Sequence, residues 1–157
     1  MILERALEIA ERVRGEMGPF CERCEIAGSI RREKPEVKDI EICYIPRGKD
    51  LPKLAEVFNK WPAVKGRIGG RYTQRTHPAG ITLDLFAATP DNWGLIFTIR
   101  TGSADYSRNV LATGWVKAGY KSVGGMLHRN GTPVPAPEER DLFRLIGVEW
   151  KPPSGRL

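Results

Sequence analysis

Three carboxylates occupy positions in this sequence from which they could act on one substrate. Asp39 and Glu41 lie two residues apart in residues 37–45, an alternating segment that predicts a β-strand. Side chains at positions i and i+2 of a strand share a face, so both acids should project together while Ile40 and Ile42 point into the core. Two neighbouring carboxylates repel unless a cation lies between them. We therefore expect Mg²⁺ there, because it prefers oxygen ligands and bridges substrate phosphates.

A third acid, Asp84, lies in a second predicted strand over residues 80–88, and its neighbours Leu83 and Leu85 should point into the core. It is the only acid within a basic stretch of the chain, which a solvated surface would not favour. If the two strands are adjacent, the three carboxylates converge on one point. That geometry suits two metal ions that clamp an in-line phosphoryl displacement.

A glycine-serine turn precedes the paired acids. Gly28 lets the backbone approach a phosphate closely, and the hydroxyl and N–H of Ser29 can donate to phosphate oxygens. Arg32 offers a planar set of donors that would neutralise a triphosphate. A Gly-Ser pair alone is a weak signal, but its fixed spacing before a paired-acid strand strengthens it. The alternative is that the three acids are surface residues and that Arg31 and Arg32 form salt bridges with them.

The chain carries a formal net charge of +6, from 25 basic and 19 acidic residues, which favours a polyanionic partner. Arg67, Arg71 and Arg75 share a parity in a predicted strand over residues 67–76, so they could follow the phosphates of a nucleic-acid backbone. Arg108, in a later segment that lacks acids, is a further candidate for DNA contact. The alternative for all of these residues is a solvated face or edge strand.

Hydrophobic periodicity and turn residues predict an α+β fold. We expect helices over residues 2–17, 51–60, 105–118 and 138–146, strands over 25–29, 37–45, 67–76 and 80–88, and a hairpin at Asn130-Gly131. Residues 92–100 fit either a helix or a strand. A shift in composition near Thr89-Pro90 predicts two parts, residues 1–90 and 91–157.

Composition limits the class of protein. Hydrophobic residues make up 41% of the 157 residues and charged residues 28%, as in ordinary soluble domains. We find no run approaching the ~18 apolar residues of a membrane span and no secretory signal pattern. Three cysteines are too few for a disulfide scaffold. We therefore expect a cytoplasmic protein without a membrane partner.

These motifs resemble the nucleotidyltransferase superfamily and, more narrowly, family X DNA polymerases, the group of DNA polymerase beta. The resemblance covers nearly the whole chain. Its narrower signs are the paired arginines after Gly-Ser, the turn Thr101-Gly102-Ser103, and a chain end similar to the family's thumb, with Leu145-Ile146-Gly147-Val148, Pro152-Pro153 and Arg156. The resemblance implies a palm over residues 1–90, with a mixed or antiparallel sheet and helices on one face, and a small α/β thumb-like, nucleotide-binding subdomain over 91–157.

The resemblance also implies an activity, namely template-directed addition of dNTPs to a primer 3′-hydroxyl at gaps or nicks during DNA repair. Asp39 and Glu41 would hold two Mg²⁺ ions, which Mn²⁺ can replace, and Asp84 would hold the primer-side ion. Gly28, Ser29 and Arg32 would bind the triphosphate. The turn Thr101-Gly102-Ser103 would lie against the sugar. The partners implied are gapped or primer-template DNA and a dNTP, bound by a monomer.

The sequence departs from the family's pattern in ways that keep alternatives open. Segments similar to the family's N-terminal lyase domain and helix-hairpin-helix DNA grip are not found, so no lyase activity is expected. Glu41 stands where the family usually has Asp, and Ile99-Arg100 replaces an aromatic pair that helps to reject ribonucleotides. One alternative is a template-independent or non-DNA nucleotidyltransferase. Another is a non-catalytic nucleic-acid-binding module of the same fold.

Overall fold

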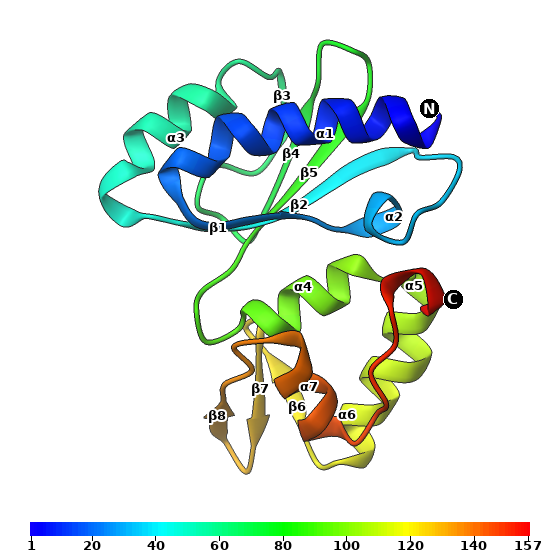
Figure 1. The fold of residues 1–157 in the computed structure, drawn as a ribbon. Coiled ribbons are helices and arrows are strands. Elements are labelled where there is room, and N and C mark those ends of the chain that lie inside the picture. The colour runs from blue at the N-terminus through cyan, green and yellow to red at the C-terminus, as the bar shows by residue number, and fades with distance from the viewer. The chain divides into compact units, whose positions relative to one another are not determined.

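The computed structural model describes all 157 residues and divides them into two compact units, Met1–Ala88 and Thr89–Leu157 (Figure 1). The sequence predicted a division at residue 90. The fold is α+β, with a five-stranded mixed sheet in the first unit and a small three-stranded antiparallel sheet in the second. None of the helices combines the length and the apolar character needed to span a bilayer.

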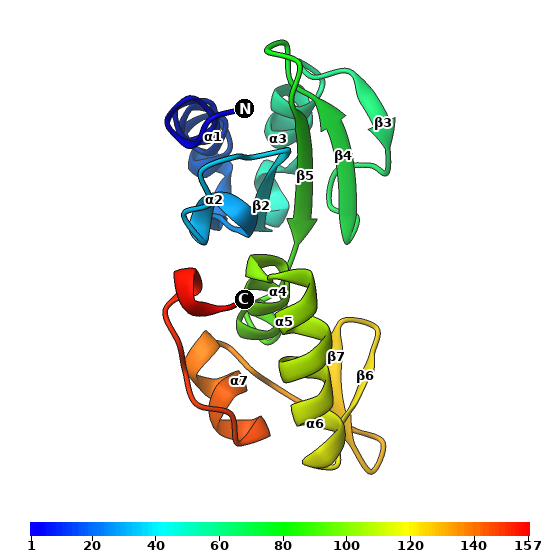
Figure 2. The same cartoon turned by 90° about the vertical axis from the view of Figure 1, so that its right-hand side faces the viewer.

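The sheet of the first unit brings together strands that are distant in the sequence. Its spatial order is β1-β2-β5-β4-β3. The strands are β1 (Cys21–Ile26), β2 (Asp39–Pro46), β3 (Ala63–Lys65), β4 (Tyr72–Thr76) and β5 (Thr82–Ala87). The central pair β2 and β5 is parallel, and the other neighbours are antiparallel. Figure 2 shows β4 and β5 side by side and running in opposite directions.

Two helices, α1 (Leu3–Met17) and α3 (Leu51–Phe58), cover one face of this sheet (Figure 1). Apolar residues recur on one side of α1 at spacings of three and four, so that side packs inward. The core between helices and sheet includes Ile9, Met17, Ile40, Ile42, Leu54, Phe58, Leu83 and Leu85. Because side chains alternate along a strand, the residues between these core positions on β2 and β5 face the other side of the sheet. Asp39, Glu41 and Asp84 occupy that side.

The second unit surrounds its own core, which includes Leu95, Tyr106, Leu111, Leu127, Leu142 and Phe143. Its helical segments are α4 (Trp93–Thr101), α5 (Ala104–Tyr106), a π-helical turn over Ser107–Ala112, α6 (Thr113–Lys117) and α7 (Glu139–Ile146). Its sheet has the order β6 (Lys121–Val123), β7 (Met126–Arg129) and β8 (Thr132–Val134). Asn130 and Gly131 both have positive φ at the β7–β8 hairpin, where the sequence predicted it.

The structure corrects some of the predicted elements. The strand predicted over 25–29 lies instead over Cys21–Ile26, because Gly28 already begins the short helix α2 (Gly28–Arg31). The strand predicted over 67–76 starts only at Tyr72, after a connection in which Gly66 and Gly69 have positive φ. Strands β3 and β6 were not predicted. Each has only three residues, all exposed, so neither shows an alternating pattern. Residues 92–100, which fitted either element, form the helix α4.

Candidate functional site

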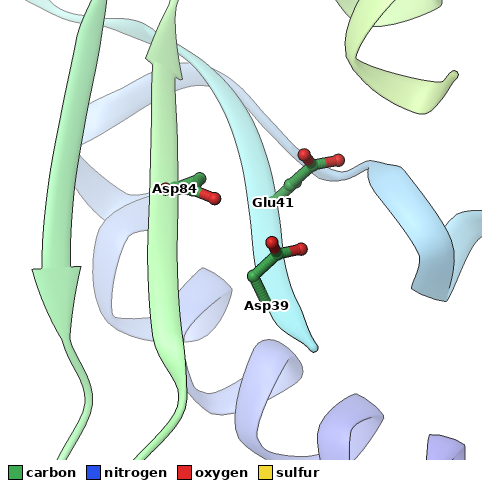
Figure 3. Close-up of side chains that lie close together, drawn as sticks. All are labelled: Asp39, Glu41 and Asp84. Carbon is green, nitrogen blue, oxygen red and sulfur yellow. The ribbon is translucent and has the colours of Figure 1, made fainter. Parts of the chain in front are cut away.

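Asp39, Glu41 and Asp84 converge at the centre of the five-stranded sheet. Each offers a carboxylate oxygen, and these oxygens all lie within 4.8 Å of one another. Glu41 and Asp84 are direct partners in the parallel pairing of β2 with β5. Asp39 precedes Glu41 by two residues and lies on the same face of β2. Figure 3 shows the three side chains directed into one shared space. The adjacency of the two strands, on which the predicted convergence depended, is therefore present.

The carboxylates in this cluster repel one another. Asp39 is partly buried and its pKa is raised, first by burial and then by the negative charge of Asp84. Arg32 and Lys38 oppose that shift with their positive charges. Three acids close together on a half-buried surface are costly unless positive charge compensates them. The three oxygens could hold a cation, and Arg32 and Lys38 already supply part of the compensating positive charge.

Gly28 lies against the side chain of Glu41. Its φ is +63°, in the left-handed region that disfavours a side chain. A Cβ at this position would overlap Oε2 of Glu41 and would lie 2.8 Å from its Cδ. The backbone N–H of Ala27 donates to the carbonyl of Glu41 over 2.8 Å, which holds the two segments together. A side chain here would force the Glu41 carboxylate to shift, so glycine permits the present position of that carboxylate.

An open pocket of about 540 Å³ adjoins the carboxylates. Asp39 lines it together with Ser29 and Arg32, the two side chains that the sequence predicted to bind phosphate. Lys34 and Lys38 line it as well, and sequence reasoning had not singled them out. The hydroxyl oxygen of Ser29 is buried and has no hydrogen-bond partner within the protein. The lining also includes the acid Glu36, so three basic and two acidic side chains border the pocket. The buried Ser29 hydroxyl and the basic side chains could serve an anionic ligand.

The arginines predicted to contact DNA are placed differently from one another. Arg67 and Arg71 are exposed and lie in the connection between β3 and β4. Arg75 is inside β4, pairs with Leu83 on the helix-covered face, and is only 7% exposed. Its guanidinium donates to the carbonyls of Gly66 and Gln74. The prediction that the three arginines share one strand face is wrong, because β4 does not extend back to Arg67 or Arg71 and Arg75 lies on the helix-covered face.

The remaining predicted residues lie in the second unit. Thr101, Gly102 and Ser103 form the turn that ends α4, and Gly102 has φ +70°. The Thr101 hydroxyl donates to the carbonyl of Phe97 over 2.7 Å, and the Ser103 hydroxyl accepts from the N–H of Tyr106 over 3.1 Å. Both side chains therefore shape the turn itself.

Arg108, the other DNA-contact candidate in the second unit, is exposed. It forms a 3.7 Å ion pair with Asp105, which lies one helical turn before it. An exposed pair of this kind contributes little to stability, so the guanidinium remains accessible to a partner.

Two residues missed by sequence reasoning hydrogen-bond a member of the cluster. The Tyr72 hydroxyl donates to Oδ1 of Asp84 over 2.7 Å, and the side-chain amide of Gln74 donates to the same oxygen over 2.9 Å. Both residues lie on β4. Their i, i+2 spacing indicates a shared face, but only the strand order reveals that this face meets Asp84.

Comparisons with known proteins leave the family open. No protein-family model matches the chain, and no curated protein matches it.

Proposed function

We propose that this protein is a nucleotidyltransferase of the family X DNA polymerase type, which adds dNTPs to a primer 3′-hydroxyl at gaps or nicks in DNA. The first unit would serve as the catalytic palm, and the second as the thumb-like, nucleotide-binding subdomain. The observation that carries the proposal is that Asp39 connects two features of the site. This residue belongs to the carboxylate cluster and also lines the pocket that contains Ser29 and Arg32.

The donor set fits a hard divalent cation. All three candidate ligands are carboxylates, and their oxygens are close enough together for one small ion or a pair of ions. The raised pKa of Asp39 reflects burial and repulsion, and a bound cation would relieve the repulsion. Asp39 and Glu41 would hold two Mg²⁺ ions, replaceable by Mn²⁺, and Asp84 would hold the primer-side ion. When bound, the ions neutralise developing charge on the phosphoryl group and favour ionisation of the attacking hydroxyl.

The chain's own residues would perform the binding and orientation. The Ser29 hydroxyl would donate to a phosphate oxygen, which satisfies a buried group that has no partner within the protein. Arg32 would hold the triphosphate with its planar donor set, and Lys34 and Lys38 would add positive charge along the same pocket. These contacts would hold the leaving pyrophosphate in the pocket, beside Asp39.

The DNA-binding part of the proposal rests on exposed positive charge. Arg67, Arg71 and Arg108 are exposed and are the candidates for phosphate contact. Arg75 is buried, so its contribution would be to hold the connection between β3 and β4 through the carbonyl of Gly66. The turn at Thr101-Gly102-Ser103 would lie against the nucleotide sugar through its backbone, since its side-chain hydroxyls are engaged within the turn.

The test is nucleotide addition to a one-nucleotide-gapped DNA in the presence of Mg²⁺, with wild-type protein and the variants Asp39→Asn, Glu41→Gln and Asp84→Asn. Each substitution removes one charge and nearly preserves the shape of the side chain. We expect wild type to extend the primer and each variant to lose more than about 100-fold in turnover, because each removes a metal ligand. DNA binding, measured by fluorescence anisotropy, should be retained or tightened.

The outcomes separate the proposal from its alternatives. Equal activity in the Asp84→Asn variant would overturn the assignment of the cluster. Extension that ignores the template would indicate a template-independent transferase. DNA binding without extension by any of the proteins, under conditions where the pocket binds nucleotide, would favour a non-catalytic binding module.

A further inference from the structure

Asp84 accepts hydrogen bonds from two side-chain donors on a single carboxylate oxygen. The Tyr72 hydroxyl and the Gln74 amide both donate to Oδ1, over 2.7 Å and 2.9 Å, and neither donates to Oδ2. The Gln74 amide also donates to the Tyr72 oxygen over 2.9 Å, which closes a small network of three side chains. Asp84 is only 7% exposed, so these bonds form where water competes little.

The sheet holds both donors rigidly. Gln74 is the direct cross-strand partner of Asp84, and Tyr72 is the partner of Phe86 two positions further along β5. The Tyr72 ring stacks on the Phe86 ring, with centroids 5.0 Å apart and planes 12° apart. The ammonium of Lys65 lies 5.0 Å from the centre of the same Tyr72 ring. The phenol is therefore fixed by its ring, independently of its hydroxyl.

We propose that Tyr72 and Gln74 are positioning residues for Asp84. By occupying Oδ1, they fix the rotation of the carboxylate and leave Oδ2 for the cation shared with Asp39 and Glu41. This inference rests on the proposed metal-dependent function and extends it to residues that touch neither substrate nor cation. Hydrogen-bond partners that orient a metal ligand commonly change metal affinity or activity by about 10- to 100-fold when they are removed.

The experiment uses substitutions that remove the donors and keep the packing. Tyr72→Phe deletes only the hydroxyl and retains the stack on Phe86. Gln74→Met has a similar length and no donor. The control is Tyr44→Phe, since Tyr44 is a buried tyrosine on the opposite face of β2 whose hydroxyl accepts a hydrogen bond from the N–H of Gly69.

The first readout is the dissociation constant for Mn²⁺ in the absence of DNA and nucleotide, measured by electron paramagnetic resonance. We expect the Tyr72→Phe/Gln74→Met double variant to bind Mn²⁺ about 10-fold more weakly than wild type or more. Tyr44→Phe should bind like wild type. In an Asp84→Asn background, adding the Tyr72 and Gln74 substitutions should change Mn²⁺ affinity no further, because their target carboxylate is gone.

The second readout is steady-state nucleotide addition. The double variant should lose kcat while KM for the nucleotide stays within about twofold, because the phosphate pocket is formed by other residues. A double variant with wild-type Mn²⁺ affinity and wild-type kcat would overturn the positioning role while leaving the proposed function standing. If wild type itself adds no nucleotide, the proposed function fails, and the Mn²⁺ comparison still decides whether Tyr72 and Gln74 orient a metal ligand.

Discussion

A Cβ added to Gly28 would overlap Oε2 of Glu41 where that side chain now lies, so the carboxylate would have to move. The contact joins the start of α2 with the strand that carries two of the three carboxylates. A change at this one glycine therefore tests whether the position of Glu41 matters to activity.

We predict that Gly28→Ala displaces the Glu41 carboxylate and lowers turnover and Mn²⁺ affinity together. The positive φ adds a backbone cost of about 1 kcal/mol to the free energy of folding. The control is Gly15→Ala, because nothing lies within 4 Å of a Cβ at Gly15, which is inside α1. The Gly15→Ala substitution should stabilise the protein by about 0.5–1 kcal/mol, because alanine is favoured over glycine inside a helix. Wild-type Mn²⁺ affinity in a folded Gly28→Ala protein would contradict the account.

The arginines around β4 should separate into two groups. Arg67→Ala and Arg71→Ala should each weaken DNA binding and reduce the slope of log affinity against log salt by about 1, since each removes one phosphate contact. Arg75→Ala should instead lower the midpoint of urea unfolding, because its buried guanidinium donates to backbone carbonyls. Anisotropy titrations at several salt concentrations measure the first effect. An unchanged salt slope in both exposed variants would remove them from the interface.

Arg156 should be the most sensitive position in the second unit. Its side chain is fully buried and pairs with Glu139 over 2.9 Å, while its carbonyl accepts from the N–H of Ser103. Arg156→Met should destabilise this unit by about 3–5 kcal/mol, because it removes the positive charge that balances a carboxylate only 12% exposed, although the Thr98 hydroxyl still donates to that carboxylate.

The control for Arg156→Met is Arg5→Ala. Arg5 and Glu8 form an exposed ion pair of similar length, 3.0 Å, and its loss should cost less than about 1 kcal/mol. Denaturant unfolding measures both changes. Equal small losses in the two variants would show that burial of the Arg156 pair has no energetic consequence.

Stability should depend on the protonation of His77. Its Nδ1 accepts a hydrogen bond from the N–H of Ala79 over 3.0 Å, and burial lowers its pKa from about 6.5. As pH falls below that value, the unfolded chain takes up a proton before the folded chain does, so the free energy of unfolding decreases until the folded pKa is reached. His77→Gln should lose less stability than wild type between pH 7.5 and about 5.5. Urea unfolding at both values measures this, and parallel losses would refute it.

The sequence predicted the carboxylate cluster because alternation along two strands is a local property. The identity of Asp39, Glu41 and Asp84, and the faces they share, followed from spacing alone. Their partners did not, because Tyr72 and Gln74 reach Asp84 through the order of strands in the sheet. That order depends on packing between segments that are distant in the chain.

Two other features could not be predicted from the sequence, because they depend on the residue at which a strand begins and on contacts between residues distant in the chain. The sequence pattern places Arg75 on the same strand face as Arg67 and Arg71 because it starts the strand at residue 67, whereas β4 starts at Tyr72. The pairing of Arg156 with Glu139 joins the chain end to α7, and no periodicity signals it. Turn chemistry was more informative, since Asn130-Gly131 marked its hairpin correctly.

A single matrix of reactions shows whether the carboxylate cluster performs template-directed nucleotide transfer. Four gapped DNAs that differ only in the templating base would each be offered the four dNTPs separately with Mg²⁺, with Asp84→Asn protein as the blank. The account predicts addition only of the complementary nucleotide in each case and none with the variant. Addition of the same nucleotide regardless of the templating base, or equal addition by Asp84→Asn, would contradict it.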